Sequence, residues 1–114
     1  KPFLKQQAHF ELAWTSFDKV ARYYRKNIAQ VNSEGRMHPT QKPATLYQFC
    51  LKEFGGQGQK ILDTHLGSGS IAIACHYAGL DLTASEIDEK YFADAMEYIK
   101  NETSQTTLFN HLII

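Results

Sequence analysis

Two carboxylates and a glycine-rich turn form the part of the sequence whose residue types could bind a ligand. The turn Gly67-Ser68-Gly69-Ser70-Ile71-Ala72 has the spacing G-x-G-x-x-A, and Glu86 follows about 20 residues later. Glycine lets the backbone turn tightly, and the free N–H groups of the next helix favour an acceptor. The acid can accept hydrogen bonds from ribose hydroxyls, so the pattern predicts an adenosine-containing cofactor. The alternative is a strand-to-helix turn that needs glycine for its shape alone.

Asp63 distinguishes between two cofactors that both contain adenosine. It lies four positions before Gly67. A carboxylate there repels the pyrophosphate of NAD, whereas it attracts the ammonium or sulfonium of S-adenosylmethionine. The sequence therefore favours S-adenosylmethionine, with an NAD-dependent oxidoreductase fragment as an alternative. A Walker-type phosphate loop is not present, because Gly58-Gln59-Lys60-Ile61 lacks the Ser or Thr that should follow the Lys.

The elements around this turn alternate between helix and strand. Apolar stripes predict helices at residues 43–54, at 71–78 and around 92–99, and short apolar runs predict strands at 60–63 and 82–85. Glycines end the first two helices at Gly55 and Gly79. This order predicts an α/β fold with a mostly parallel sheet, flanking helices and right-handed crossovers. We expect the apolar helix at 71–78 to be sandwiched between neighbours.

The two ends of the chain carry weaker patterns. Residues 10–17 alternate bulky and polar side chains, which predicts a strand with Trp14 in the core, and residues 20–25 suggest a second, less clear strand. The polar stretch at 29–38 is expected to be a loop. The polar run at 101–107 predicts that residues 103–114 form a loose tail.

Composition bounds the protein class. The 114 residues are 43% hydrophobic and 21% charged, which is ordinary for one globular domain, and no apolar run approaches the ~20 residues that span a bilayer. Cys50 and Cys75 have no metal-ligand spacing and lie in apolar helical patterns, so we expect buried thiols in a reducing, cytoplasmic setting without a membrane.

Charge is unevenly distributed although the formal net charge is zero. Residues 19–42 contain six Lys and Arg side chains against one acid, whereas residues 61–114 are strongly acidic. The basic stretch has Tyr23 and Tyr24 interleaved, which favours contact with DNA phosphates. The alternative is a solvated edge hairpin that carries cations to deter strand pairing. The candidate DNA-binding residues are Arg22, Arg25, Lys26 and Arg36.

Three segments in a fixed order resemble a known family. His38-Pro39-Thr40-Gln41-Lys42-Pro43 precedes Asp63-Thr64-His65-Leu66-Gly67-Ser68-Gly69-Ser70, and Ala84-Ser85-Glu86-Ile87-Asp88 follows. This order resembles the β-class (DPPY-type) DNA amino-methyltransferases. The wording DTHLGSGS, with Thr64 for the usual Pro and His65 for the usual Phe, looks like a phage and prophage subgroup of adenine-N6 methylases.

The resemblance implies a partial Rossmann-like methyltransferase fold that binds S-adenosylmethionine. It implies that Asp63 and the backbone of residues 65–69 hold the methionine moiety, that Glu86 holds the ribose and that Ile87 lies against the adenine. Thr40 and Lys42 would lie near the cofactor carboxylate, although by spacing alone Thr40 could equally cap a helix with Pro43 in its first turn. The implied cofactor-binding residues are Thr40, Lys42, Asp63, His65, Leu66, Gly67, Ser68, Gly69, Glu86 and Ile87.

The catalytic motif of this family does not occur in the chain. No D-P-P or N-P-P is present, and in the β-class order that motif would lie upstream of Lys1. We therefore expect a single C-terminal fragment that carries no catalytic residue and no metal site and is inactive alone. Its divisions would be residues 10–36, 38–54, 60–102 and 103–114.

In the complete enzyme, the resemblance implies methyl transfer to the N6 amine of adenine in double-stranded DNA, with the amine of cytosine as the alternative. An exposed sheet edge could also pair with a second copy as a homodimer. The functional alternative outside the enzyme classes is a non-catalytic nucleotide- or DNA-binding module.

Overall fold

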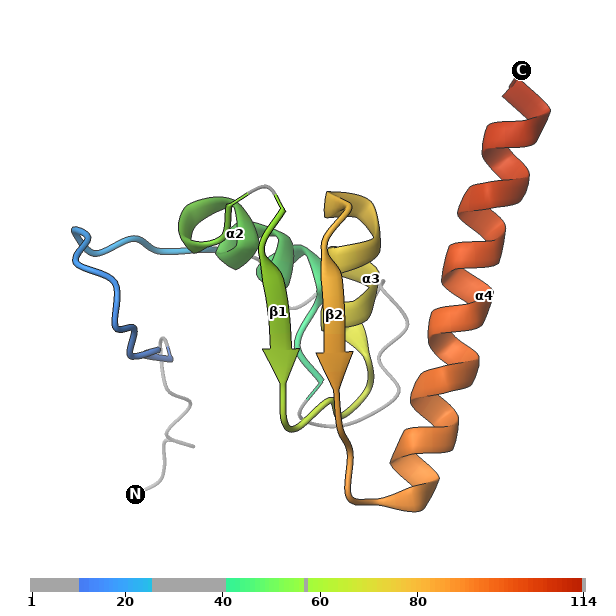
Figure 1. The fold of residues 1–114 in the computed structure, drawn as a ribbon, viewed down its shortest axis with the longest axis horizontal. Helices are drawn as coiled ribbons and strands as arrows, with labels where there is room; N and C mark the ends of the chain where they lie inside the picture. The colour runs from blue at the N-terminus through green and yellow to red at the C-terminus, as the bar shows by residue number, and fades with distance from the viewer. Residues whose placement is uncertain (1–10, 26–40, 57, 114) are drawn as a thin grey trace, which may run out of the picture.

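The computed structural model describes residues 11–25, 41–56 and 58–113, with side chains described as far as residue 104. The elements in these ranges are α2 (Ala44–Phe54), β1 (Lys60–Asp63), α3 (Ser70–Ala78), β2 (Asp81–Ala84) and α4 (Glu89–Ile113). The two strands are parallel neighbours, so β1, α3 and β2 form a β-α-β unit (Figure 1). The α/β order and the parallel pair expected from the sequence are confirmed at this level.

α3 packs against the two-stranded sheet, and α2 and α4 pack against α3. Lys60 pairs with Asp81 at one end and Asp63 with Ala84 at the other. Ile61 and Asp63 are half-buried, whereas the alternate positions of β1 are exposed. Because successive strand side chains point to opposite faces, Ile61 and Asp63 lie on the helix-covered face. Figure 1 shows α3 behind β2.

The core forms around α3, which contacts α2, β2 and α4. This position explains its almost wholly apolar composition and confirms that it is sandwiched. Cys75 is buried in α3, but Cys50 in α2 is only half-buried, so just one of the two thiols matches the expected burial. The buried apolar residues are Leu66, Ile73, Ala74, Cys75 and Ala95.

The strands predicted at residues 10–17 and 20–25 are wrong for their described part, because residues 11–25 form no strand. The segment instead packs against α2. The ring of Phe17 lies 5.6 Å from that of Phe54, and the ring of Tyr24 lies 5.6 Å from that of Phe49. A period-two pattern forms a strand only where a sheet edge pairs with its backbone N–H and C=O groups. Residues 11–25 lie beside the side chains of α2 instead of beside a strand.

Trp14 also departs from its expected place in the core. Its side chain is 88% exposed, and that of Leu12, which shares its strand phase, is 89% exposed. The alternation of residues 10–17 therefore does not bury its bulky side chains among the described residues.

The C-terminal region is helical where a loose tail was expected. α4 continues through residues 101–113, and the Thr103 hydroxyl donates to Ile99 O at 2.8 Å within it. Polar residues do not end a helix by themselves, and no Gly or Pro follows Gly79 to do so. No helix in the described ranges is both long and apolar enough to cross a membrane. The predicted division at residue 103 therefore has no counterpart in secondary structure.

Candidate cofactor-binding site

The candidate site lies where β1 and β2 end (Figure 1). The Ser85 amide donates to Asp63 O at 3.0 Å, and the Leu66 amide donates to Ser85 O at 2.9 Å. The parallel pairing thus continues beyond the strands and holds the two following segments side by side. Ligands of α/β folds bind at the carboxyl ends of parallel strands. The structure therefore brings the predicted residues Asp63 and Glu86 to the same edge of the sheet.

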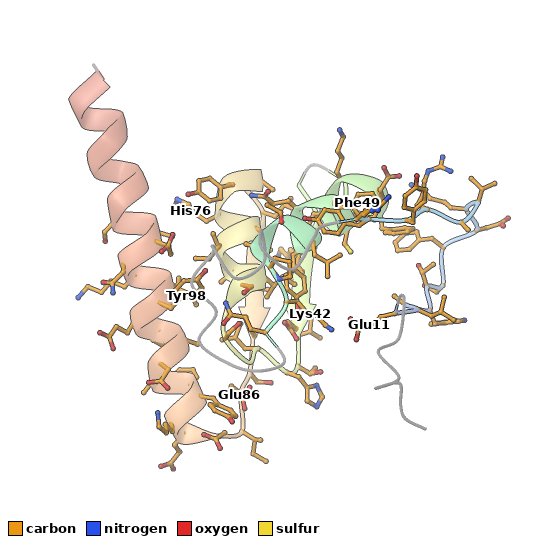
Figure 2. All side chains as sticks on the ribbon, turned by 180° about the vertical axis from the view of Figure 1, so that it is seen from behind. Glu11, Lys42, Phe49, His76, Glu86 and Tyr98 are labelled. Atoms are coloured by element: carbon orange, nitrogen blue, oxygen red, sulfur yellow. The ribbon has the colours of Figure 1, made fainter. Side chains whose placement is uncertain are left out.

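Glu86 binds the glycine turn directly. Its Oε1 accepts a hydrogen bond from the Gly67 amide at 2.8 Å, and its Oε2 accepts one from the Asp88 amide at 2.9 Å. These bonds, Asp88 first and then Gly67, lower the pKa of Glu86 below its ordinary value because they favour the ionised form. The sequence predicted this acid as a ribose ligand but not as a support of the turn. Figure 2 shows Glu86 at the end of the molecule that carries the site.

Asp63 is held at the helix-covered face of the sheet. Its Oδ1 accepts a hydrogen bond from the His65 amide at 2.9 Å, which fixes the start of the turn. Burial first, and then the negative charge of Asp63, raise the pKa of both Tyr47 in α2 and Cys75 in α3. The negative charge of Asp63 therefore acts on a side chain of α2 and on a side chain of α3. A carboxylate in this position is suited to attract a cation.

The glycines of the turn are needed for two different reasons. Gly67 has φ +61° and Gly69 has φ +90°, a left-handed region that side chains with a Cβ rarely adopt. A Cβ on Gly69 would also lie 2.9 Å from Ile99 Cδ1 and 3.4 Å from Ala95 Cβ. Gly69 thus lets α4 pack against the start of α3, and this packing requires glycine whether or not a ligand binds.

Most amides of the turn are already used within the protein. The His65 amide donates to Asp63, the Leu66 amide to the chain after β2 and the Gly67 amide to Glu86, while the Gly69 amide donates to Leu66 O at 3.2 Å. Within the described residues, the Ser68 amide is the one between positions 65 and 69 with no hydrogen-bond acceptor. The whole backbone of residues 65–69 was expected to hold the methionine moiety. Of its amides in the described residues, that of Ser68 is the one left to donate to a ligand.

Two of the predicted cofactor-binding residues near the turn, His65 and Ile87, are exposed. The His65 ring lies with Nδ1 2.8 Å from the Thr64 hydroxyl, and Ile87 is 97% exposed beside Glu86. An apolar side chain with so little protein contact is free to lie against a flat ring. The Leu66 side chain is instead buried in the core, so only its backbone faces the turn. No three His, Cys, Asp or Glu side chains gather as metal ligands in the described ranges.

Lys42 does not extend freely toward the turn. Its Nζ lies 2.6 Å from Glu11 Oε2, and this contact lowers the pKa of Glu11 (Figure 2). Thr40 lies outside the described residues. Pro43 occupies the N-cap position of α2, without a side-chain cap hydrogen bond, so the alternative that placed it in the first turn is one residue off.

Sequence reasoning missed Gln41 and Ser70 as a pair. Gln41 is 8% exposed and Ser70 2% exposed, and Gln41 Nε2 donates to Ser70 Oγ at 3.4 Å. Gln41 lies within the His38–Pro43 motif and Ser70 closes the glycine turn. The position of each residue in a recognised motif was the signal that could have drawn attention to them. Their spacing in the sequence did not predict that Gln41 and Ser70 are in contact.

Part of the basic segment serves the local structure. Lys19 donates to Glu53 O and lies 5.5 Å from the centroid of the Phe54 ring, at the C-terminal end of α2. Cations are favoured at that end of a helix. Arg22 Nε lies 3.6 Å from Glu53 Oε2 with its side chain 50% exposed. Of the other candidate DNA-binding residues, Arg25 is exposed, and Lys26 and Arg36 lie outside the described residues.

A family model of DNA methylases, covering N6 and N4 methyltransferases, matches residues 4–97. The chain belongs to this family. The match spans the basic segment, the His38–Pro43 motif and the complete β-α-β unit, so the methyltransferase resemblance is confirmed for most of the chain. The match identifies the family and does not distinguish its β-class or phage-like members.

A curated relative has the same kind of activity in its name. The type II methyltransferase M.HpaI of Haemophilus parainfluenzae is 30% identical over 76 residues, which make up 67% of this chain and 24% of that enzyme. The chain thus matches about a quarter of the length of this methyltransferase. No solved structure matches the chain.

Proposed function

We propose that this chain is the S-adenosylmethionine-binding part of a β-class DNA amino-methyltransferase that modifies adenine at N6. The observation that supports it most is the placement of Asp63 at the end of β1 and of Glu86 just after β2, where the His65 amide donates to Asp63 and the Gly67 amide donates to Glu86. Membership of the DNA methylase family supports the reaction class.

The residues present fit the proposed cofactor. The half-buried carboxylate of Asp63 suits the ammonium and sulfonium charges, and a pyrophosphate would be repelled there. Each Glu86 oxygen keeps a lone pair for a ribose hydroxyl after accepting one amide. Exposed Ile87 offers an apolar surface for the adenine. When bound, S-adenosylmethionine supplies an electrophilic methyl group, and the role of these residues is to bind and orient it.

Methyl transfer itself requires groups that this chain does not contain. A DPPY-type motif would bind the flipped base and its amino group, and the sequence has no D-P-P or N-P-P. We therefore expect the chain alone to bind cofactor without methylating DNA. The phosphates of double-stranded DNA would be contacted by the basic segment that includes Arg22, Arg25, Lys26 and Arg36.

Calorimetric titration with S-adenosylhomocysteine and with NADH tests the cofactor assignment. We expect the first ligand to bind and the second not to bind. Asp63→Asn should weaken S-adenosylhomocysteine binding, whereas Asp81→Asn, at the opposite end of the sheet, should leave it unchanged. Binding of NADH alone would favour an oxidoreductase fragment, and binding of neither would favour a non-catalytic module.

A further inference from the structure

Gln41 is a buried polar residue to which the proposed cofactor site gives no role. Its side chain is 8% exposed, and its Nε2 donates to the hydroxyl of Ser70, itself 2% exposed, at 3.4 Å. Gln41 lies just before α2, whereas Ser70 is the first residue of α3. The contact therefore joins two segments that are far apart in the sequence, at the base of the glycine turn.

A second contact carries this link into the turn. Ser70 Oγ lies 3.2 Å from Ser68 Oγ. A hydroxyl has one proton to donate and two lone pairs. If the Gln41 amide donates to Ser70, the Ser70 proton is available for Ser68 Oγ, and the Ser68 proton is then available for a ligand. By occupying one lone pair of Ser70, the buried amide favours the arrangement in which Ser70 donates to Ser68.

The donors at the end of this chain suit an anion. The Ser68 amide has no acceptor within the described residues, and α3 begins two residues later. The N-terminal N–H groups of a helix carry a positive partial charge that favours a carboxylate or phosphate. Asp63, whose carboxylate accepts the His65 amide at the start of the same loop, suits the ammonium of the same amino-acid group.

We infer that Gln41 is a positioning residue for the carboxylate end of the cofactor, acting through Ser70 on the hydroxyl and amide of Ser68. This inference rests on the proposed function, because it needs an adenosine cofactor with an amino-acid tail. It adds a residue from the His38–Pro43 motif to the glycine turn, and it predicts discrimination between ligands with and without that tail.

The test compares two ligands that differ in the tail. S-adenosylhomocysteine has the amino acid, whereas 5′-methylthioadenosine lacks it. Gln41→Leu removes the amide donor while keeping an apolar volume, and it should weaken S-adenosylhomocysteine binding roughly five- to tenfold. The affinity for 5′-methylthioadenosine should stay within about twofold, because loss of one hydrogen bond at the tail leaves the adenosine contacts intact. A merely structural role would lower both affinities together.

Four further variants of the chain make the result specific. Gln48→Leu, on the exposed side of α2, should change neither affinity. Ser70→Ala should reproduce the effect of Gln41→Leu, and the double variant should bind no more weakly than either single variant. Gln41→Glu keeps the side-chain length but accepts from Ser70, which reverses the hydroxyl direction, so it should weaken S-adenosylhomocysteine binding at least as much. Thermal unfolding midpoints show whether each variant is folded. If Gln41→Leu does not fold, Gln41→Glu takes its place as the test of the inference.

The outcomes separate the inference from the proposed function. Equal loss of both ligands in the Gln41 variants, or loss of neither, overturns the positioning role while the cofactor site stands. If the unaltered chain binds neither ligand, the cofactor assignment fails and the inference fails with it.

Discussion

Glu86 accepts a hydrogen bond from the Gly67 amide at 2.8 Å, which ties the end of β2 to the turn after β1. Gly67 has φ +61° at this point. The second carboxylate oxygen accepts the Asp88 amide at 2.9 Å, so one side chain supports both segments that follow the strands. The acid expected to hold a ribose therefore also holds the turn when no ligand is present.

Replacing Glu86 should loosen the turn before it affects any ligand. Glu86→Gln keeps one acceptor but turns an amide NH2 toward the other backbone N–H, so one of the two hydrogen bonds is lost. We expect amide exchange at Gly67 or Asp88 to accelerate roughly tenfold without ligand. Hydrogen exchange read by NMR measures this directly. Glu97→Gln, on the exposed face of α4, is the matched control, and equal exchange in both variants would contradict the support role.

The same contact predicts a pH dependence with a defined sign. The amide hydrogen bonds lower the pKa of Glu86, so their stabilisation is complete above the ordinary Glu value of about 4.3 and is lost as the pH falls through the lowered value. Protection of the Gly67 amide should therefore persist to a pH below that ordinary value and then disappear. Glu11 has a lowered pKa too, through Lys42, so the titration is best done in Glu11→Gln. Loss of protection that begins above pH 5 would argue against this assignment.

Replacing Gly69 by alanine should destabilise the protein more than the same change at Gly79, which also has a left-handed backbone conformation. Gly69→Ala combines a left-handed φ with a Cβ placed 2.9 Å from Ile99 Cδ1, and should lower the free energy of unfolding by about 2–4 kcal/mol. Gly79→Ala has φ +68° and open space around its Cβ, so about 1 kcal/mol is expected.

Chemical denaturation measures both glycine variants. Ile99→Val shortens the side chain that clashes, so it should recover part of the loss in Gly69→Ala and none of the loss in Gly79→Ala. Equal losses in the two alanine variants would mean that packing against α4 does not constrain Gly69.

Local patterns predicted the centre of the fold well. The glycine turn, the apolar helix after it and the two short strands depend on residues adjacent in sequence, and they were located within a residue or two. Residues 11–25 could not be predicted in the same way, because a period-two pattern becomes a strand only beside a sheet edge. Their contacts with Phe49 and Phe54 in α2 depend on tertiary packing that the alternation does not contain.

The candidate site also combines features that local sequence predicts with contacts that depend on tertiary packing. The proximity of Asp63, Gly67 and Glu86 was predictable from residue type and spacing, and their roles toward a cofactor stay predictions. The ion pair of Lys42 with Glu11 and the contact of Gln41 with Ser70 join residues about 30 positions apart, and neither follows from a motif. A polar run also failed to mark the end of α4, because polar residues are compatible with a helix that no Gly or Pro interrupts.

The basic segment should contribute unequally to DNA binding. Arg22 already pairs with Glu53 at 3.6 Å, whereas Arg25 is exposed, so Arg25 keeps more of its charge available to phosphates. In an enzyme that includes this segment, Arg25→Glu should weaken binding to duplex DNA and reduce the salt dependence of the affinity by about one phosphate contact or more. Arg22→Glu should also destabilise the segment, and Arg22→Glu combined with Glu53→Arg should restore its stability without restoring DNA affinity.

The measurement is the slope of affinity against salt concentration, with Lys100→Glu on α4 as a charge-matched control. A change at Lys100 alters the net charge by the same amount at a position outside the basic segment. If Arg25→Glu and Lys100→Glu shift the affinity and the slope equally, the effect comes from net charge. The segment along α2 would then serve only to pack against that helix.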